Sequence, residues 1–371
     1  MLFELTNEQR YYLGLTQVHK SWERIEFDEN TYLYFHDDKL VKIINVSENM
    51  YYESELNETT AENRTLILPK TSKGKIRKLN QTALRSLRGI GVYFYFGNGD
   101  IQISNFTTQT TFFSSRWGEE KIDNLEGMQK WLNWWISDTT ANDINDIELF
   151  KLSTRQHCKY REGDFFAFKT GRRQYGFGRI LLVIAPIRKA VEEGKVDEKH
   201  YGLMNLMGKA LVIKVYKITS DTTDMDLNEL KQCEAFLSQY IMDNVFYYGE
   251  YKILENLPLE PFELEFPVSY SRSINALDKD TVYLQYGLIY KETHISKYSK
   301  YLTDPNNEFM GVNNPFRNSS IGFYVDTSPY HMELDLRSLH NANIKHEIFD
   351  FFGLDANKSY YENYLEYQHT K

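Results

Sequence analysis

The chain has little proline, little cysteine and no long apolar run. Only 8 of its 371 residues are proline and 2 are cysteine. Cys158 and Cys233 lie far apart in the sequence and form no C-x-x-C pair, which argues against a disulfide framework and against a cysteine zinc site. No apolar run reaches the roughly 18 residues that a membrane-spanning helix needs. The first eight residues carry acids where a signal peptide carries basic and then apolar residues. We therefore expect a cytoplasmic protein without a membrane segment.

Aromatic residues, in contrast, are abundant. The chain contains 28 Tyr and 23 Phe, and 42% of its residues are hydrophobic. A chain of this length can form two domains with cores of their own. Aromatic-rich and proline-poor composition favours twisted β-sheets. The net charge of −9 argues against a general binder of nucleic acid or anionic membranes and is compatible with a basic protein partner.

Local signals place a first, β-rich domain at residues 1–150. Thr6 and Gln9 have the spacing of a capping box, so a helix is expected to begin there and to end at Gly14. Strand-forming segments flank short polar turns, of which Asn98-Gly99 is one of the clearest hairpin signals. The expected hairpins are 31–35 with 40–46 and 91–96 with 101–106, followed by a helix over 124–136 with Met128, Leu132 and Trp135 on one stripe. The polar residues 137–146 are expected to form a linker.

A second β-rich domain is expected over 153–371. Its opening reads as a β-hairpin, because Phe165, Phe166 and Phe168 favour a strand and a polar turn precedes the return strand that starts at Tyr175. The further expected elements are a partly helical insert at 188–201, strands at 210–219, 245–253 and 282–289, a helix near 229–239 and a terminal amphipathic helix at 345–352.

Two glycines lie on one face of the return strand. Gly176 and Gly178 alternate with Tyr175, Phe177 and Arg179, which the period of two places on the other face. Glycines in this arrangement indicate that another backbone or a large ring approaches closely. We interpret them as a tight corner of a small barrel rather than as a ligand cradle, and their spacing differs from a dinucleotide-binding fingerprint.

No catalytic constellation stands out. Glu162 and Asp164 bracket Gly163 and could form a carboxylate pair, although we favour a role in the turn before the strand. Neither cysteine lies in a catalytic signature, and no G-x-S-x-G elbow or H-E-x-x-H motif occurs. We expect no catalytic residue, metal, cofactor or small-molecule ligand.

Acidic residues form three clusters that could attract a cationic partner. Each cluster alone is an ordinary solvated surface, but together they could raise the association rate of a basic protein. The clusters are Asp143, Asp146 and Glu148; Asp221, Asp224, Asp226 and Glu229; and Glu255, Glu260, Glu263 and Glu265.

The second domain resembles the bacterial immunity protein 26 family, also called immunity 26/phosphotriesterase HocA, over roughly residues 156–339. The motifs that carry the resemblance are REGDFFAF at 161–168, YGFGRIL at 175–181, QYGLI at 285–289, KE at 291–292, SKYSKYL at 296–302, NPFRN at 314–318 and IGF at 321–323. The resemblance implies a β-rich domain, encoded beside toxin genes of polymorphic toxin systems, that binds and neutralises a cognate toxin. It supplies no catalytic residues, and the metal ligands that a phosphotriesterase would need are not apparent. The first 150 residues lie outside it.

We therefore expect a β-rich α+β protein of two domains that acts as an immunity protein (antitoxin). Each domain would be a twisted antiparallel sheet or small barrel with a few helices, and the second would begin like an SH3 barrel. The protein would bind a cognate toxin, which could be basic, and cover its active or substrate-binding site. The expected toxin contacts are the exposed residues Arg172, Arg173, Tyr175, Arg179 and Arg317, although Tyr175 and Arg179 could equally be structural. The residues expected to build the family fold are Gly163, Asp164, Gly176, Gly178, Gly287, Asn314 and Pro315.

Two alternative functions remain. His331, Glu333 and Asp335 alternate along one segment and could bind the metal of a hydrolase, although a half-buried strand explains them as well. The segment from Asn63 to Gly99 contains no Asp or Glu. A nucleic-acid-binding protein could use this segment, with Tyr93 and Tyr95 as stacking platforms. Its basic residues, between 64 and 88, are Arg64, Lys70, Lys73, Lys75, Arg77, Lys78, Arg85 and Arg88.

Overall fold

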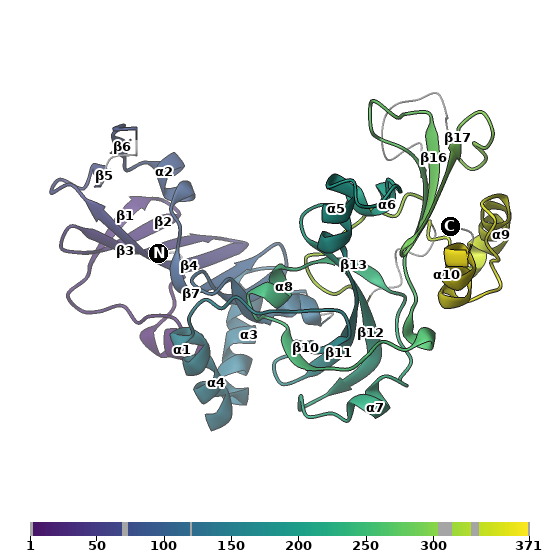
Figure 1. Cartoon of the computed structure of the whole chain (residues 1–371). Helices are drawn as coiled ribbons and strands as arrows, with labels where there is room; N and C mark the ends of the chain where they lie inside the picture. Colours follow the sequence, from purple (N-terminus) through teal and green to yellow (C-terminus); the bar gives the residue numbers. More distant parts are fainter. Residues whose placement is uncertain (1–2, 69–72, 119–120, 303–313, 328–333, 370–371) are drawn as a thin grey trace. The chain divides into compact units, whose positions relative to one another are not determined.

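The computed structural model describes residues 3–68, 73–118, 121–302, 314–327 and 334–369 (Figure 1). The chain divides into two compact units, which we describe separately. Unit 1 comprises Met1–Cys158 together with Lys169–Arg173 and Tyr248–Glu250. Unit 2 comprises Lys159–Phe168, Gln174–Tyr247 and Tyr251–Lys371. None of the helices in the described ranges combines the length and the apolar character needed to cross a membrane.

Unit 1 is built on a nine-stranded antiparallel sheet. Its main path has the strand order β1-β2-β3-β4-β7-β8-β9, and the short strands β5 and β6 extend from β4. The strands are β1 Glu23–Asp28, β2 Thr31–His36, β3 Lys39–Ser47, β4 Met50–Thr60, β5 Leu66–Leu68, β6 Arg77–Lys78, β7 Ile90–Gly97, β8 Asp100–Asn105 and β9 Thr110–Ser114. The helices are α1 Asn7–Tyr12, α2 Gln81–Ser86, the 3-10 turn η1 Ser115–Trp117, α3 Leu125–Asp138 and α4 Ala141–Leu152.

The core of unit 1 lies between one face of this sheet and the helices α1, α3 and α4. The predicted stripe of α3 is confirmed, because Met128, Leu132 and Trp135 are each fully buried. They pack in one cluster with strand residues such as Tyr51 and Phe94. A second, smaller cluster on strands β2 to β4 is completed by Leu84 and Leu87 from the region of α2.

Several local predictions for this unit are confirmed. Thr6 and Gln9 form the capping box of α1, and both predicted hairpins form, as β2–β3 and β7–β8. Asn98 and Gly99 adopt φ values of +55° and +84°, as a type I′ hairpin turn requires. The linker predicted at 137–146 is wrong, because α4 begins at Ala141. Its polar residues are helix caps and solvent-facing positions rather than a flexible connection.

Unit 2 contains a five-stranded sheet of order β13-β12-β11-β10-β14 and a three-stranded sheet of order β15-β16-β17. The strands are β10 Asp164–Lys169, β11 Tyr175–Val183, β12 Ala210–Ser220, β13 Gln239–Met242, β14 Lys252–Asn256, β15 Val268–Arg272, β16 Thr281–Tyr286 and β17 Ile289–His294. The helices are α5 Ile184–Glu192, α6 Tyr201–Met204, α7 Leu227–Leu230, α8 Asn244–Tyr247, α9 Ala342–Phe351 and α10 Tyr360–His369, with 3-10 turns η2 Pro261–Glu263 and η4 Leu339–Asn341.

The β-rich α+β fold class is confirmed, and of the two predicted alternatives the structure shows antiparallel sheets rather than small barrels. Every sheet in the described ranges is open, so the second domain does not begin as an SH3-like barrel. The β10–β11 hairpin is continued by β12 and β13 on one side and by β14 on the other. Two register shifts between β11 and β12, at 176–178 and 180–182, bend this sheet without closing it.

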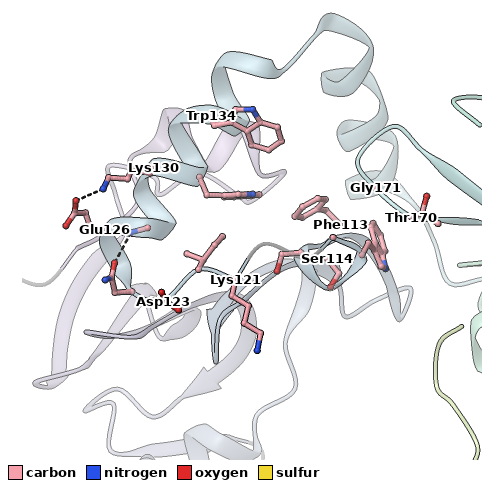
Figure 2. Close-up of a pocket in the computed structure, with 16 residues that line it drawn as sticks. Phe113, Ser114, Lys121, Asp123, Glu126, Lys130, Trp134, Thr170 and Gly171 are labelled. Carbon is pink, nitrogen blue, oxygen red and sulfur yellow. Dashed lines mark hydrogen bonds and ion pairs between the residues drawn. The ribbon is translucent and has the colours of Figure 1, made fainter. Parts of the chain in front are cut away.

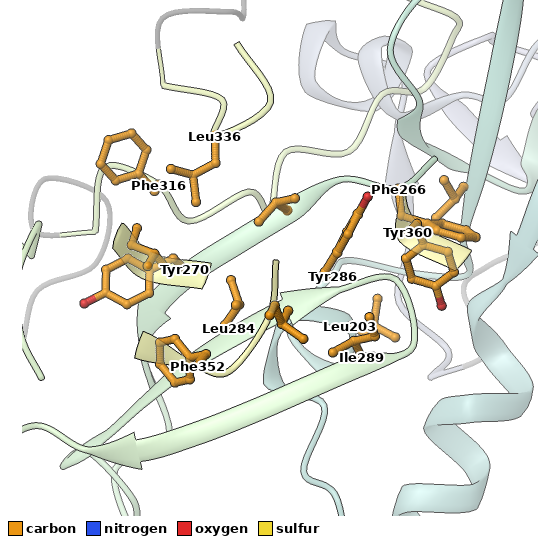
Figure 3. Packing of buried hydrophobic residues seen from close by; sticks show 14 of the residues in the cluster. Leu203, Phe266, Tyr270, Leu284, Tyr286, Ile289, Phe316, Leu336, Phe352 and Tyr360 are labelled. Carbon is orange, nitrogen blue, oxygen red and sulfur yellow. The ribbon is translucent and has the colours of Figure 1, made fainter. Parts of the chain in front are cut away.

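The largest core cluster of unit 2 joins the three-stranded sheet to the C-terminal helices (Figure 3). Tyr286 contacts Phe349 of α9 and Tyr360 of α10, with ring centroids 5.6 and 5.0 Å apart. The helix predicted at 345–352 is confirmed as α9, but it is not terminal, because α10 follows it. The C-terminal helices therefore supply part of the same core as the sheet.

Three other predictions for unit 2 were inaccurate. The helix expected near 229–239 is the single turn α7, and the strand expected at 245–253 begins with the helical turn α8. Gly249 has φ +75° and interrupts that strand, so that β14 starts only at Lys252. The expected strand at 282–289 is two strands, because Gly287 with φ +54° forms the turn between β16 and β17.

Candidate functional site

The family motif at 161–168 forms a tight turn into β10. Gly163 has φ +82°, and a Cβ placed there would lie 2.3 Å from the carbonyl oxygen of Leu257. The buried carboxylate of Asp164 accepts hydrogen bonds from the backbone N–H of Arg161 at 2.7 Å and from the amide of Asn256 at 2.8 Å. These contacts give Asp164 the turn role favoured by the sequence.

Gly178 marks the closest approach in the sheet. A Cβ at this position would lie 2.3 Å from the ring of Phe166 and 2.5 Å from the carbonyl oxygen of Lys214. The sequence predicted that either a ring or another backbone would approach this strand, and both do. Gly176 is also buried, and a register shift separates the two glycines.

Arg179 is a core residue and not an exposed contact. Its side chain is 0% exposed and forms an ion pair with Glu263, which is 1% exposed. The guanidinium also donates to the carbonyl oxygens of Leu257 and Pro258, both at 2.8 Å. The predicted exposure of Arg179 is therefore wrong, because β11 directs this face of the strand into the unit.

Arg172 lies in the turn between β10 and β11, which belongs to unit 1. Its guanidinium carbon lies 3.7 Å from the ring centroid of Trp135, and the side chain is only 8% exposed. It donates hydrogen bonds to the Trp135 carbonyl oxygen at 3.0 Å and to the Thr139 hydroxyl at 2.6 Å. Burial lowers the pKa of this guanidinium, against the opposing charge of Asp143. The expectation that Arg172 is exposed is therefore wrong.

Arg173 is more open, with 44% of its side chain exposed. It nevertheless forms an ion pair with Asp143 and donates to the carbonyl oxygen of Asp138 at 2.6 Å. The hydrogen bond from Arg173 holds the pKa of Asp143 well below its usual range, and burial only partly opposes this shift. Arg172 and Arg173 thus fasten the hairpin turn to helices α3 and α4 within unit 1.

The remaining candidate contacts lie in unit 2. Tyr175 is half-buried and packs against the cluster that contains Phe165, Phe177 and Tyr216. Arg317 is also half-buried, and its charge acts on the hydroxyl of Tyr283. Arg317 therefore lies at the three-stranded sheet, whereas Tyr175 belongs to the five-stranded one.

The later residues of the family motifs, Gly287, Asn314 and Pro315, lie in turns of unit 2. A Cβ at Gly287 would lie 2.8 Å from the rings of Phe266 and Tyr360, so the turn is tightly covered. The buried side-chain oxygen of Asn314 accepts a hydrogen bond from the backbone of Arg272 at 2.9 Å. Pro315 follows it in a turn and is half-buried.

A tryptophan-lined hollow of about 840 Å³ lies beside the Arg172 turn in unit 1. Figure 2 shows Trp134 above it and Phe113 at its side, with Thr170 and Gly171 of the turn at its edge. Trp134 is 50% exposed. The ammonium of Lys130 is paired with Glu126 at 2.7 Å along α3. This hollow was not predicted from the sequence, although the W-x-x-W-W spacing from Trp131 indicates aromatic residues on more than one face of the helix.

The carboxylates of the three acidic clusters differ in whether they form ion pairs with basic side chains. Asp143 is paired with Arg173, and Glu263 is paired with Arg179. In the cluster that runs from the end of β12 into α7, four carboxylates are exposed and form no ion pair with any described residue. They are Asp221, Asp224, Asp226 and Glu229. This loop therefore retains its negative charge at the surface.

An exposed aromatic side chain accompanies this loop in the same unit. Phe262 of η2 is 55% exposed. Lys231, directly after α7, forms an ion pair with Glu260, directly before η2, which fixes these two segments to each other. Phe262 was not predicted as a contact from the sequence, although its position between Glu260 and Glu263 marks it as an aromatic residue in a polar segment.

The metal hypothesis receives no support from the residues that can be described. His331 and Glu333 lie outside the described residues, and Asp335 forms an ion pair with Arg337 at 2.7 Å. Within the described ranges, no group of three or more His, Cys, Asp or Glu side chains is placed to hold a metal ion.

The basic segment is partly neutralised. Arg64 pairs with Glu23 at 2.7 Å, and Arg77 lies 3.8 Å from Glu58. Lys70 lies outside the described residues. The exposed cations are Lys73, Lys75, Lys78, Arg85 and Arg88.

Comparison with known proteins supports one part of the predicted resemblance. Searches of curated proteins and of solved structures found no significant match. One family model matches residues 161–280. The predicted resemblance extended to residue 339, so the motifs from 285 onward lie beyond this matched region. That region covers the β10–β11 hairpin, the Arg179–Glu263 ion pair and the acidic loop. Over residues 161–280, the chain matches the sequence model of the family Immunity protein 26.

Proposed function

We propose that this protein is an antitoxin that binds a cognate bacterial protein toxin in a one-to-one complex and thereby inhibits it. The observation that carries the proposal is the match of residues 161–280 to the Immunity protein 26 family. In this proposal the protein acts in the cytoplasm by covering the toxin's active or substrate-binding site, without catalysing a reaction. An inhibitor of this kind needs a rigid surface whose shape and charge are complementary to those of the toxin.

We further propose that the partner contacts the exposed part of the matched segment. The carboxylates of the β12–α7 loop would attract a basic toxin and raise its association rate. Phe262 would act as an apolar anchor, because a large aromatic side chain that becomes buried contributes strongly to binding. Tyr175, Arg173 and Arg317 remain candidate contacts. Arg172 and Arg179 do not, because their guanidinium groups are used within the protein.

The experiment is a titration of the toxin encoded beside this gene with the purified full-length protein. We expect inhibition that is complete at a molar ratio of one and a dissociation constant that calorimetry can measure. Phe262→Ala should weaken binding at least tenfold, as for other interface anchors. Leu277→Ala is the matched control, because Leu277 is 97% exposed in the same matched segment.

The charge contribution is tested separately. Asp221→Asn with Asp224→Asn should slow association and weaken its dependence on salt, because two exposed charges are removed from the loop. Glu192→Gln with Asp197→Asn removes the same charge from another exposed part of the matched segment and should leave association unchanged. A folded protein that neither binds nor inhibits the toxin would overturn the proposed function. Inhibition that is insensitive to all these variants would instead overturn the proposed surface.

A further inference from the structure

The face of the unit 1 sheet opposite α3 carries a row of polar and aromatic side chains. Adjacent residues of the row are direct cross-strand partners, from Asn45 on β3 to Tyr52 on β4, Tyr95 on β7 and Gln102 on β8. All four side chains are half-buried. Two neighbouring tyrosines with an amide on each side thus form the centre of this face.

This pattern differs from a sheet face that is simply solvated. The strand neighbours of these residues, such as Ile44 and Phe94, point to the opposite face and are fully buried in the core. A solvated face would need only small or charged side chains. Here it carries rings, which offer a flat apolar surface, beside amides, which offer hydrogen bonds.

A hollow of about 940 Å³ adjoins the row and places a cation beside it. The hollow is lined by Asn45, Tyr52 and Tyr95 from the sheet and by Arg85 from α2. Helix α2 is held at this face by Leu84 and Leu87, which pack into the apolar cluster on strands β2 to β4. The fold therefore brings the α2 part of the basic segment, with Arg85, to the same face as the tyrosines.

The charge around the hollow is uneven. Arg85 and Arg88 are exposed, and neither forms an ion pair with a described residue. Asp28 and Glu29 also line the hollow, and Asp28 lies next to α2, because Gln81 of this helix donates to it. Asp28 accepts hydrogen bonds from the backbone of Asn30 at 3.0 Å and from the side chain of Gln81, so that its oxygens are engaged. Positive charge is thus available on the α2 side of the tyrosines.

We infer that this face of unit 1 binds single-stranded nucleic acid. Bases would stack on Tyr52 and Tyr95, and the amides of Asn45 and Gln102 would contact base edges. Phosphates would contact Arg85 and Arg88. Stacking on sheet aromatics beside a basic groove is a general way to bind unpaired strands, whereas the bases of a duplex are not accessible for it. The net charge of −9 argued against nucleic acid as a general partner, so the inference rests on the tyrosines together with Arg85, which lines the hollow, and Arg88, which follows α2.

The test is fluorescence anisotropy of the full-length protein with labelled single-stranded RNA and DNA of twelve nucleotides. We expect binding that weakens with salt and a much weaker response to a duplex of the same sequence. Tyr52→Ala and Tyr95→Ala should each weaken binding at least fivefold, since one stacked base is lost. Tyr52→Phe and Tyr95→Phe should retain binding, because the aromatic ring on which a base would stack remains. Tyr11→Ala is the control, since Tyr11 is 41% exposed on α1, which packs on the opposite face.

The cations are tested by their effect on salt dependence. Arg85→Ala with Arg88→Ala should weaken binding to all sequences and reduce the slope of log K against log salt by about one to two. Lys20→Ala with Lys130→Ala removes the same charge from exposed positions elsewhere in unit 1. This control should leave the affinity and the slope unchanged. Absence of binding at 50 μM, equal binding of the duplex, or equal binding of the tyrosine variants would each overturn the inference. Equal retention of poly-glutamate would point to an acidic protein partner instead.

Discussion

Arg179 and Glu263 form an ion pair in the interior of unit 2, where their side chains are 0% and 1% exposed. The pair joins strand β11 to the turn η2, which follows β14 by only a few residues. The ring of Phe165 lies 4.2 Å from the guanidinium carbon and excludes water from one side of it. Arg179, which was predicted from the sequence as a toxin contact, therefore links two segments of the matched region.

Removing one partner of this pair should destabilise unit 2. Arg179→Met leaves the carboxylate of Glu263 buried without its countercharge, at a cost of about 3–5 kcal/mol. Thermal unfolding followed by far-ultraviolet circular dichroism should show a lower transition temperature. Arg161→Met is the matched control, because Arg161 lies just before β10 in the same matched region and is 74% exposed. Equal stability of the two variants would contradict the structural role assigned to Arg179.

Gly178 should not tolerate a side chain. The methyl group of Gly178→Ala would meet the Phe166 ring and the Lys214 carbonyl oxygen at less than 3 Å, so the sheet would have to shift. We expect a loss of at least 2 kcal/mol, as for other overpacked cores. Gly194→Ala is the control. No neighbour lies within 4 Å of a Cβ there, and only its φ of +64° adds strain of about 1 kcal/mol. A smaller loss at position 178 than at 194 would be inconsistent with the observed packing.

The two arginines of the β10–β11 turn should differ in their effect on unit 1. Arg172→Ala removes a buried guanidinium that covers Trp135, and we expect a loss of about 2 kcal/mol. Arg173→Ala removes a partly exposed ion pair, and we expect a loss below about 1 kcal/mol. All five tryptophans lie in unit 1, so tryptophan fluorescence reports the unfolding of this unit. The reverse order of the two losses would show that Arg172 does not anchor the turn.

The stability of unit 1 should decrease between pH 5 and pH 8 because of Glu250. Burial raises the pKa of this carboxyl from 4.5 to about 7, although a hydrogen bond from the backbone of Thr111 partly opposes the shift. The folded state therefore holds the proton longer than the unfolded state. The resulting stability is complete below pH 4.5 and is lost as the pH rises through 7.

Glu250→Gln removes this titration and keeps the hydrogen-bond acceptor. Relative to the variant, the natural protein should lose up to about 3 kcal/mol between pH 5 and pH 8, measured by urea unfolding with tryptophan fluorescence. Glu126→Gln is a control, because Glu126 is 73% exposed in the same unit. Parallel pH profiles of the natural protein and Glu250→Gln would disprove the assignment.

Short-range signals were sufficient where one segment supplies its own structure. The capping box of Thr6 and Gln9, the Asn98-Gly99 turn and the apolar stripe of α3 depend on neighbours a few residues away, and all three predictions are confirmed. The same reasoning failed for α4, whose polar surface resembles a linker because Asp143 and Ile147 are its only buried residues. The capping box of Thr140 and Asp143 that begins this helix is itself a short-range signal, but the polar composition of the segment outweighed it in the prediction.

The sequence by itself determined the alternation of the strands, the hairpin turns and the resemblance of residues 161–280 to an immunity protein family. The tertiary structure alone decided which charged residues remain at the surface. Arg179 and Arg172 are buried because Glu263, Trp135 and Asp143 lie beside them in the fold although they are distant in the chain. The row of Asn45, Tyr52, Tyr95 and Gln102 also depends on the tertiary structure, because the sheet pairs strands that are distant in the chain. Pattern and turn chemistry act locally, whereas exposure and pairing depend on which segments the sheet brings together.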